Sequence, residues 1–181
     1  MSLIAQQCIV GGVLPTPTPR LQFREMTHHD LDDMTALLSD PEVMRHYPAP
    51  MSRDEAAKWI AWNERNYAEH GFGLWIVELA VDGTFVGDCG LTVQDVEGER
   101  MVEVGYHVGT AWQGRGLATE AAAAVRDAAR NAGIPHLIAI IRPGNHSSRR
   151  VAEKIGLRLD RQIVKNGGDA LVFSVDLQTA P

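Results

Sequence analysis

The sequence has few cysteines, and no apolar run in it is long enough to span a membrane. Its two cysteines, Cys8 and Cys89, are too few for a disulfide framework and lack the spacing of metal ligands. The seven histidines are scattered, and only His28 and His29 are neighbours, so no metal site is indicated. These absences favour a cytoplasmic protein that binds no metal and does not enter a membrane.

A surplus of basic residues is also missing. The chain has 17 Lys and Arg against 23 Asp and Glu, which gives a formal net charge of −6. Because a nucleic-acid binder usually shows a basic face, we expect no nucleic-acid partner. A signal peptide is not indicated either, since no basic residue precedes Arg20 and the pair Gln6 and Gln7 interrupts the apolar N-terminal stretch.

What is present indicates one folded domain. The 181 residues are 45% hydrophobic and 22% charged, which is ordinary for a globular protein with a sizeable core. Glycines and prolines gather near the N-terminus, where Pro15, Pro17 and Pro19 alternate with threonine. This composition predicts a flexible N-terminal lead over residues 1–19 and a single domain over residues 20–181.

Periodicity and turn residues predict the order of the elements. Strands are expected over Arg20–Glu25, Leu74–Ala80, Thr84–Thr92, Met101–Val108, His136–Ile141, Leu157–Val164 and Ala170–Leu177. Helices are expected over Asp30–Ser39, Arg53–His70, Ala118–Ala132 and from Ser147 or Ser148 to about Gly156, with a further helical turn that begins at Asp40. Three consecutive strands without helices between them predict an antiparallel meander and exclude a doubly wound nucleotide fold. We therefore expect an α/β (α+β) fold, with a mixed, twisted sheet of about seven strands and helices on both faces.

The stretch 101–132 reads as a strand, a glycine turn and a helix. Gly114 and Gly116 carry no Cβ, so a phosphate can approach the backbone closely. The unpaired N–H groups at the start of the helix favour an anion at the same place. The turn therefore predicts a phosphate cradle, although a plain glycine-rich connection between strand and helix would look alike.

Two common phosphate-binding motifs do not match this turn. A Walker A loop needs a lysine followed by serine or threonine after its second glycine, and here Leu117, Ala118 and Thr119 follow Gly116. A dinucleotide fingerprint would want an acidic residue at the end of the next strand, which here is followed by Arg142.

A third motif matches closely. Gln113-x-x-Gly116-x-Ala118 is the Q/R-x-x-G-x-G/A signature of the GNAT N-acetyltransferases. The run 112–121 resembles the RimJ/RimL-like branch, which acetylates the N-termini of ribosomal proteins, and residues 145–157 resemble that branch's N-x-x-S…K-x-G-F segment. The resemblance extends over residues 19–177, and it implies the GNAT fold and an acetyl-CoA-dependent N-acetyltransferase.

The resemblance also implies where acetyl-CoA binds. Its pantetheine arm would lie where the strands 101–108 and 136–141 splay apart, against the main chain of Tyr106, His107 and Val108. Its pyrophosphate would rest on the turn and the first residues of the helix, namely Gln113, Gly114, Arg115, Gly116, Leu117, Ala118 and Thr119. Asn145 matches the asparagine that bonds the cofactor arm. Arg115, Arg142 and Arg149 are equal candidates for the phosphate on the ribose.

Glu103 is the candidate general base, acting directly or through a water. Strand alternation places Glu103, Gly105 and His107 on one face, and a carboxylate near a strand centre must be paired, wet or functional. His107 is the reserve base because its pKa lies near neutrality. Ser148 is the candidate that protonates or hydrogen-bonds the leaving sulfur, since no tyrosine follows Asn145. The alternative is that Asn145 shapes the turn and a serine caps the helix.

The acceptor is expected to be a small-molecule amine or a protein N-terminus. The resemblance implies a pocket walled by His46, Tyr47, Trp59 and Tyr67, although Trp59 and Tyr67 would alternatively belong to the core. Two other functions remain, a catalytically silent CoA-binding sensor or interaction domain and a nucleotide-binding αβ domain. A homodimer is the working assumption for the oligomeric state.

Overall fold

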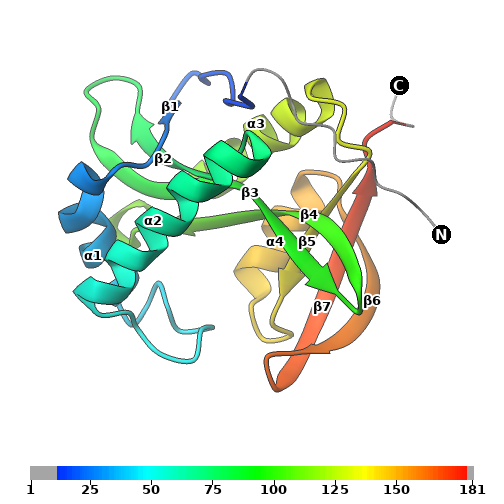
Figure 1. Ribbon diagram of the computed structural model, residues 1–181. Helices are drawn as coiled ribbons and strands as arrows, with labels where there is room; N and C mark the ends of the chain where they lie inside the picture. Colours follow the sequence, from blue (N-terminus) through cyan, green and yellow to red (C-terminus); the bar gives the residue numbers. More distant parts are fainter. Residues whose placement is uncertain (1–11, 179–181) are drawn as a thin grey trace.

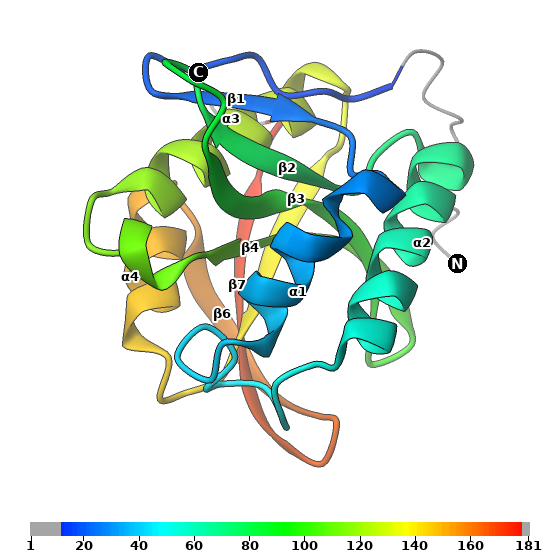
Figure 2. The same cartoon turned by 90° about the vertical axis from the view of Figure 1, so that its left-hand side faces the viewer.

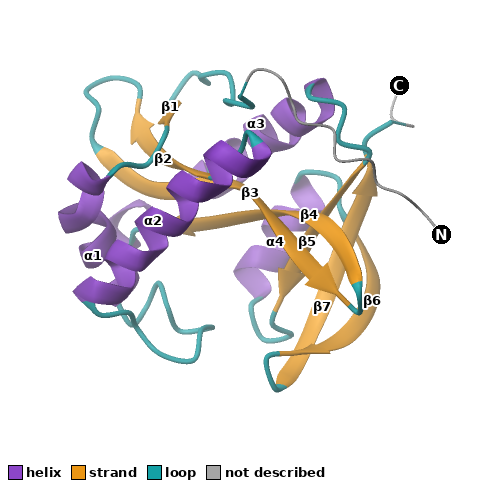
Figure 3. Cartoon of the chain, in the orientation of Figure 1, coloured by secondary structure: helices purple, strands orange, loops and turns teal. Residues whose placement is uncertain are grey.

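The computed structural model describes residues 12–178, which form one sheet with helices packed on both of its faces (Figures 1 and 3). In chain order the elements are β1 (Leu21–Arg24), η1 (His28–Asp30), α1 (Leu31–Ser39), α2 (Arg53–His70), β2 (Leu74–Leu79), β3 (Phe85–Val96), β4 (Glu99–Val108), η2 (Thr110–Trp112), α3 (Leu117–Asn131), β5 (His136–Ile141), α4 (His146–Lys154), β6 (Arg158–Lys165) and β7 (Gly168–Asp176). None of the helices formed by these residues is both long and apolar enough to cross a membrane.

The sheet has seven strands in the order β1-β2-β3-β4-β5-β7-β6. The strands β2, β3 and β4 are antiparallel neighbours, as predicted, and β6 and β7 form the terminal hairpin. β5 lies parallel to β4, because α3 carries the chain back across the sheet between them. The mixed α/β fold is therefore confirmed.

β4 and β5 stay paired over very little of their length. Their register contains a single pair, Glu103 with Ile138, whereas β5 pairs with β7 from His136 to Ile141. The two strands thus separate beyond Glu103. Their separation leaves main-chain groups of β4 facing a gap in the middle of the sheet.

Both faces of the sheet are covered, and the described residues form three buried apolar clusters, of which the two largest lie on opposite faces of β2. Leu74 and Ile76 of β2 pack with α1 and α2, while Trp75 and Val77 pack in the cluster that includes α3. Figure 2 shows α1 and α2 on one side of the sheet and α3 and α4 on the other. This double coverage explains why β2 begins with four consecutive buried residues rather than an alternating pattern.

The helical turn predicted after Asp40 is present, since Met44 N donates to Asp40 O at 3.0 Å, and Asp40 Oδ1 caps it by accepting a hydrogen bond from Glu42 N at 2.8 Å. Two other local predictions need correction. β3 continues past Thr92 to Val96, because Glu97 and Gly98 both adopt positive φ and make a tight turn into β4. α4 begins at His146 and is capped by Asn145, not by a serine.

The predicted flexible lead lies partly outside the described residues, since the structure describes none of residues 1–11. Residues 12–19 pack against the domain. Val13 is buried, and its N–H donates to Gly71 O at 2.8 Å. Thr18 Oγ1 donates to Glu120 Oε1 at 2.6 Å, which ties the segment to the start of α3.

Candidate active site

A cavity of about 850 Å³ opens beside the gap between β4 and β5. It extends from the start of α3 to the turns at 42–48 and the side of α2. The predicted site residues that line it are His46, Tyr47, Trp59, Glu103, Tyr106, His107, Val108, Gln113, Gly114, Gly116, Leu117, Ala118, Thr119, Asn145 and Ser148. Sequence positions more than 100 residues apart therefore meet around one cavity.

The glycine turn has the geometry of an anion cradle. Gly114 and Gly116 have φ of 74° and 78°, in the left-handed region that favours glycine. Gly116 is the N-cap residue of α3, and no side chain caps the helix there. A Cβ added at Gly114 would meet nothing within 4 Å, so the space over the turn is open. Gln113 closes the turn, because its Nε2 donates to Val108 O at 3.0 Å.

Arg20 fastens this cradle from outside. Its Nε donates to Glu120 Oε2 at 2.6 Å, and its Nη1 donates to the carbonyl oxygen of Arg115 at 3.0 Å. Burial by itself raises the pKa of the Glu120 carboxyl, but bonds from Thr18 and Arg20 outweigh it and lower that pKa. Glu120 is therefore an ionised anchor that holds residue 20 against the loop.

The main chain of β4 offers two N–H groups to the gap. The N–H of His107 is already taken, since it donates to Asp88 Oδ1 on β3 at 3.1 Å. Successive peptide groups of a strand point to opposite edges, so the N–H groups of Tyr106 and Val108 point toward β5. The prediction that the main chain of His107 meets the cofactor is thus wrong for its N–H group. The N–H groups of Tyr106 and Val108 remain candidates for contacts with the cofactor.

Glu103 lies where β4 and β5 begin to separate. Its Oε1 accepts a hydrogen bond from Ile140 N at 3.0 Å, and Thr92 Oγ1 donates to its Oε2 at 3.4 Å. Burial raises the pKa of its carboxyl to about 7, and the bond from Ile140 opposes that shift only in part. A carboxylate that gains and loses a proton near neutral pH is suited to act as a general base.

His107 belongs to a chain of hydrogen bonds. Its Nδ1 lies 2.8 Å from Asp88 Oδ1, and its Nε2 lies 2.7 Å from the hydroxyl of Tyr47. Burial alone lowers the pKa of His107, but the charge and hydrogen bond of Asp88 outweigh it and raise that pKa above its ordinary value. Enclosure of the hydroxyl and the carboxylates of Glu103 and Asp88 raise the pKa of Tyr47, which as a whole residue is 42% exposed, so the hydroxyl stays protonated.

Asn145 and Ser148 stand at the start of α4, across the gap. Asn145 Oδ1 accepts from Ser148 N at 3.1 Å and from Ser147 Oγ at 3.0 Å, so its oxygen caps the helix. The hydroxyl of Tyr106 donates to Ser148 O at 3.0 Å and so joins β4 to α4.

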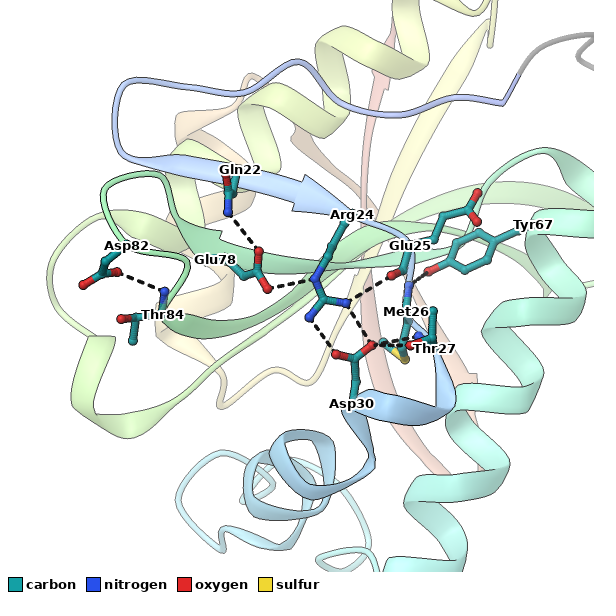
Figure 4. Close-up of polar contacts among 10 residues, drawn as sticks. All are labelled: Gln22, Arg24, Glu25, Met26, Thr27, Asp30, Tyr67, Glu78, Asp82 and Thr84. Atoms are coloured by element: carbon teal, nitrogen blue, oxygen red, sulfur yellow. Dashed lines mark hydrogen bonds and ion pairs between the residues drawn. The ribbon is translucent and has the colours of Figure 1, made fainter.

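Two predicted site residues lie elsewhere. The hydroxyl of Tyr67 accepts a bond from Met26 N at 3.0 Å and donates to Leu74 O, so this ring supports the core beside β1, as Figure 4 shows for its contact with Met26. The nearby polar network of Arg24, Asp30 and Glu78 is likewise structural. The Arg115 guanidinium lies 5.0 Å from the ring centroid of Trp112, and Arg115 is not among the residues that line the cavity.

Several residues of the site are not among those predicted from the sequence. Asp88 is 0% exposed although its side chain is a carboxyl group, and an aspartate inside the apolar strand 85–91 was the available signal. Trp62 lines the cavity one turn of α2 after Trp59. Of the three arginines considered for the ribose phosphate, Arg142 alone lines the cavity. Further basic residues line it as well, namely Arg150, Lys154 and Lys165.

Comparison with known proteins identifies the family. The model of the acetyltransferase (GNAT) domain matches residues 20–158. The chain belongs to the GNAT acetyltransferase family. It is 37% identical over 150 residues to the uncharacterized protein YkkB of Bacillus subtilis (strain 168), which covers 82% of this chain and 87% of YkkB.

Solved GNAT structures share the fold. The acetyltransferase of Agrobacterium tumefaciens str. C58 has a TM-score of 0.78 and 26% identity, over 89% of this chain and 93% of that one. The Salmonella typhimurium protein yncA, solved with its cofactor acetyl-CoA, has a TM-score of 0.68 and 21% identity, over 88% of this chain and 95% of that one. Within residues 12–178, no group of three or more His, Cys, Asp or Glu side chains could hold a metal ion.

Proposed function

We propose that this GNAT protein transfers an acetyl group directly from acetyl-CoA to a primary amine. The observation that carries the proposal is the position of Glu103, a carboxylate with a near-neutral pKa at the point where β4 and β5 separate, in the same cavity as the glycine cradle. We place the chain in the RimJ/RimL-like branch because of its run 112–121, and we propose a cytoplasmic protein that acts as a homodimer.

The cavity fits acetyl-CoA at both of its recognisable parts. The start of α3 presents N–H groups to an anion beside two glycines, which suits a diphosphate. Arg150 and Lys154 of α4 also line the cavity and would supply positive charge for a further phosphate, whereas the guanidinium of Arg142 donates to the carbonyl oxygens of Lys165 and Asp169. The N–H groups of Tyr106 and Val108 suit the amides of an extended arm in the gap.

Glu103 would prepare the amine for attack. A free alkyl amine has a pKa of about 10, so it arrives protonated and must lose a proton before it can react. Glu103, ionised above pH 7 or so, takes that proton directly or through one water. The carboxylate stays in position during this transfer because Ile140 N holds its other oxygen.

Groups on the other side of the cavity would serve the thioester. A main-chain N–H of Tyr106 or Val108 polarises the carbonyl as charge develops on its oxygen. Ser148 lies at the start of α4, where its hydroxyl would donate to the departing sulfur. A thiol with a pKa of about 8.5 leaves readily, so most of the acceleration comes from holding both reactants together.

The substitution Glu103→Gln tests this function against a silent CoA-binding domain. The amide keeps the shape of the side chain but cannot accept the proton, so we expect the turnover number to fall about a hundredfold or more. Acetyl-CoA affinity, measured by calorimetry, should stay within about twofold. Unchanged turnover would remove Glu103 as the base, and acetyl-CoA binding without acetylation of any amine would favour the sensor function.

A further inference from the structure

A continuous row of aromatic rings walls one end of the cavity. The ring centroids of Trp62 and Trp59 are 5.2 Å apart, those of Trp59 and His107 5.8 Å, and those of His107 and Tyr47 5.2 Å. All four side chains line the cavity, and they come from α2, β4 and the turns before Pro48. We call these four residues the ring wall.

A buried carboxylate fixes the middle of the ring wall. Asp88, 0% exposed, accepts hydrogen bonds from Trp59 Nε1 at 3.4 Å and from the main chain of His107 at 3.1 Å, and it also pairs with Nδ1 of that histidine. The hydroxyl of Tyr47 then meets the far side of the histidine ring at 2.7 Å. The wall is therefore formed before any ligand binds, which lowers the entropy cost of binding.

The cavity offers few acidic groups to a polycation. Glu42 and Glu103 are the acidic residues among those that line the cavity, and the basic ones are Arg45, Arg142, Arg150, Lys154 and Lys165. Glu42 is already paired with Arg45 at 3.2 Å. Because the basic residues at the other end are assigned to the phosphates of acetyl-CoA, an acceptor with several ammonium groups would meet one acidic side chain without an ion-pair partner, Glu103.

We propose that the acceptor is a primary monoamine on an apolar body about the size of an aromatic ring, bound against the ring wall. The apolar body packs on Trp59 and Trp62, and the single ammonium group lies over a ring face near Glu103. The inference rests on the proposed acetyl transfer and names its substrate class. Acceptors whose amine carries no apolar body, such as spermidine, kanamycin or a serine-initiated peptide, are then poor acceptors.

A panel of amines tests this class. The CoA-loaded protein is titrated with phenethylamine, spermidine, kanamycin and a serine-initiated peptide in a calorimeter, and acetyl transfer is followed by release of free thiol. We expect phenethylamine to bind and to have a kcat/KM at least about tenfold above each of the others. A higher value for any of those three, or no heat from phenethylamine, would overturn the inference.

Substitutions at Trp62 test the wall itself. Trp62→Leu keeps apolar area but removes the ring, and we expect the KM for phenethylamine to rise about tenfold with acetyl-CoA affinity unchanged. Trp62→Phe keeps a ring, so its KM for phenethylamine should rise threefold or less. An equal effect of both variants, or none, would contradict the ring wall. Failure of the wild-type protein to bind acetyl-CoA would instead count against the proposed function.

Discussion

Glu103 joins two strands and carries the proposed chemistry at the same time. Because burial raises the pKa of its carboxyl to about 7, its protonation should be visible in the rate. We expect kcat/KM to fall about tenfold per pH unit below pH 7 or so, where Glu103 is protonated and cannot accept a proton. A pH profile of thiol release checks this, and a profile that stays flat from pH 5 to 7 would rule Glu103 out.

Asp88 acts on the site through His107. Its charge and hydrogen bond raise the pKa of the imidazole against the opposing effect of burial. We therefore expect Asp88→Asn to lower the pKa of His107, measured by an NMR titration of its ring protons. Tyr47→Phe is the matched control, since it removes the other partner of the ring and leaves the carboxylate in place. If the pKa of His107 were unchanged in Asp88→Asn, Asp88 would not stabilise the protonated imidazole.

At the scale of elements, the segment before β1 supports the start of α3. Arg20 joins them through Glu120 and through the carbonyl oxygen of Arg115. Arg20→Ala should weaken acetyl-CoA binding about three- to tenfold, because the glycine turn loses the hydrogen bonds that hold its shape. Arg53→Ala is the control, since it removes a comparable exposed pair, with Asp32 at 2.7 Å, on another helix. Equal affinities of both variants for acetyl-CoA would show that the hydrogen bonds of Arg20 are not needed for binding.

For the whole molecule, Glu103 links stability to pH. The pKa of its carboxyl rises from 4.5 to about 7 on folding. The contribution of this group to the free energy of unfolding is therefore complete below pH 4.5 and is lost as pH rises through 7. Asp30 and Glu120 have lowered pKa values, and their contributions are lost only as pH falls into the acid range. As pH rises from 5 to 8, the free energy of unfolding of Glu103→Gln should therefore increase by up to about 3 kcal/mol relative to that of the wild type.

Urea unfolding of both proteins at the two pH values measures this difference. A constant difference between Glu103→Gln and wild type across the range would show that the carboxyl of Glu103 is not perturbed by folding.

Much of the fold follows from local patterns. The apolar run of β5 and the capping box of α2 predict elements whose bounds the structure repeats without change, His136–Ile141 and Arg53–His70. The order of strands and helices then leaves one parallel pair, β4 with β5. The glycine turn likewise predicts a cradle from residues that are close together in the sequence.

The contacts that local patterns miss are those between distant segments. Asp88 pairs with His107 only because β3 and β4 are in a register that places them opposite each other. Tyr67 and Trp59 lie on the same helix and look alike in the sequence, yet Tyr67 turns to β1 and Trp59 to the cavity. Which rings face a cavity depends on the packing angle of the helix, which periodicity does not contain.

Two glycines at the ends of α3 allow the most direct test of the central claim, that the start of this helix binds the diphosphate of acetyl-CoA. Gly116 and Gly133 both have φ of 78°, so an alanine at either costs about 1–2 kcal/mol of strain. Calorimetric titration of acetyl-CoA into Gly116→Ala should show at least a tenfold loss of affinity, and Gly133→Ala should bind like wild type. Equal affinities in the two variants would contradict the account.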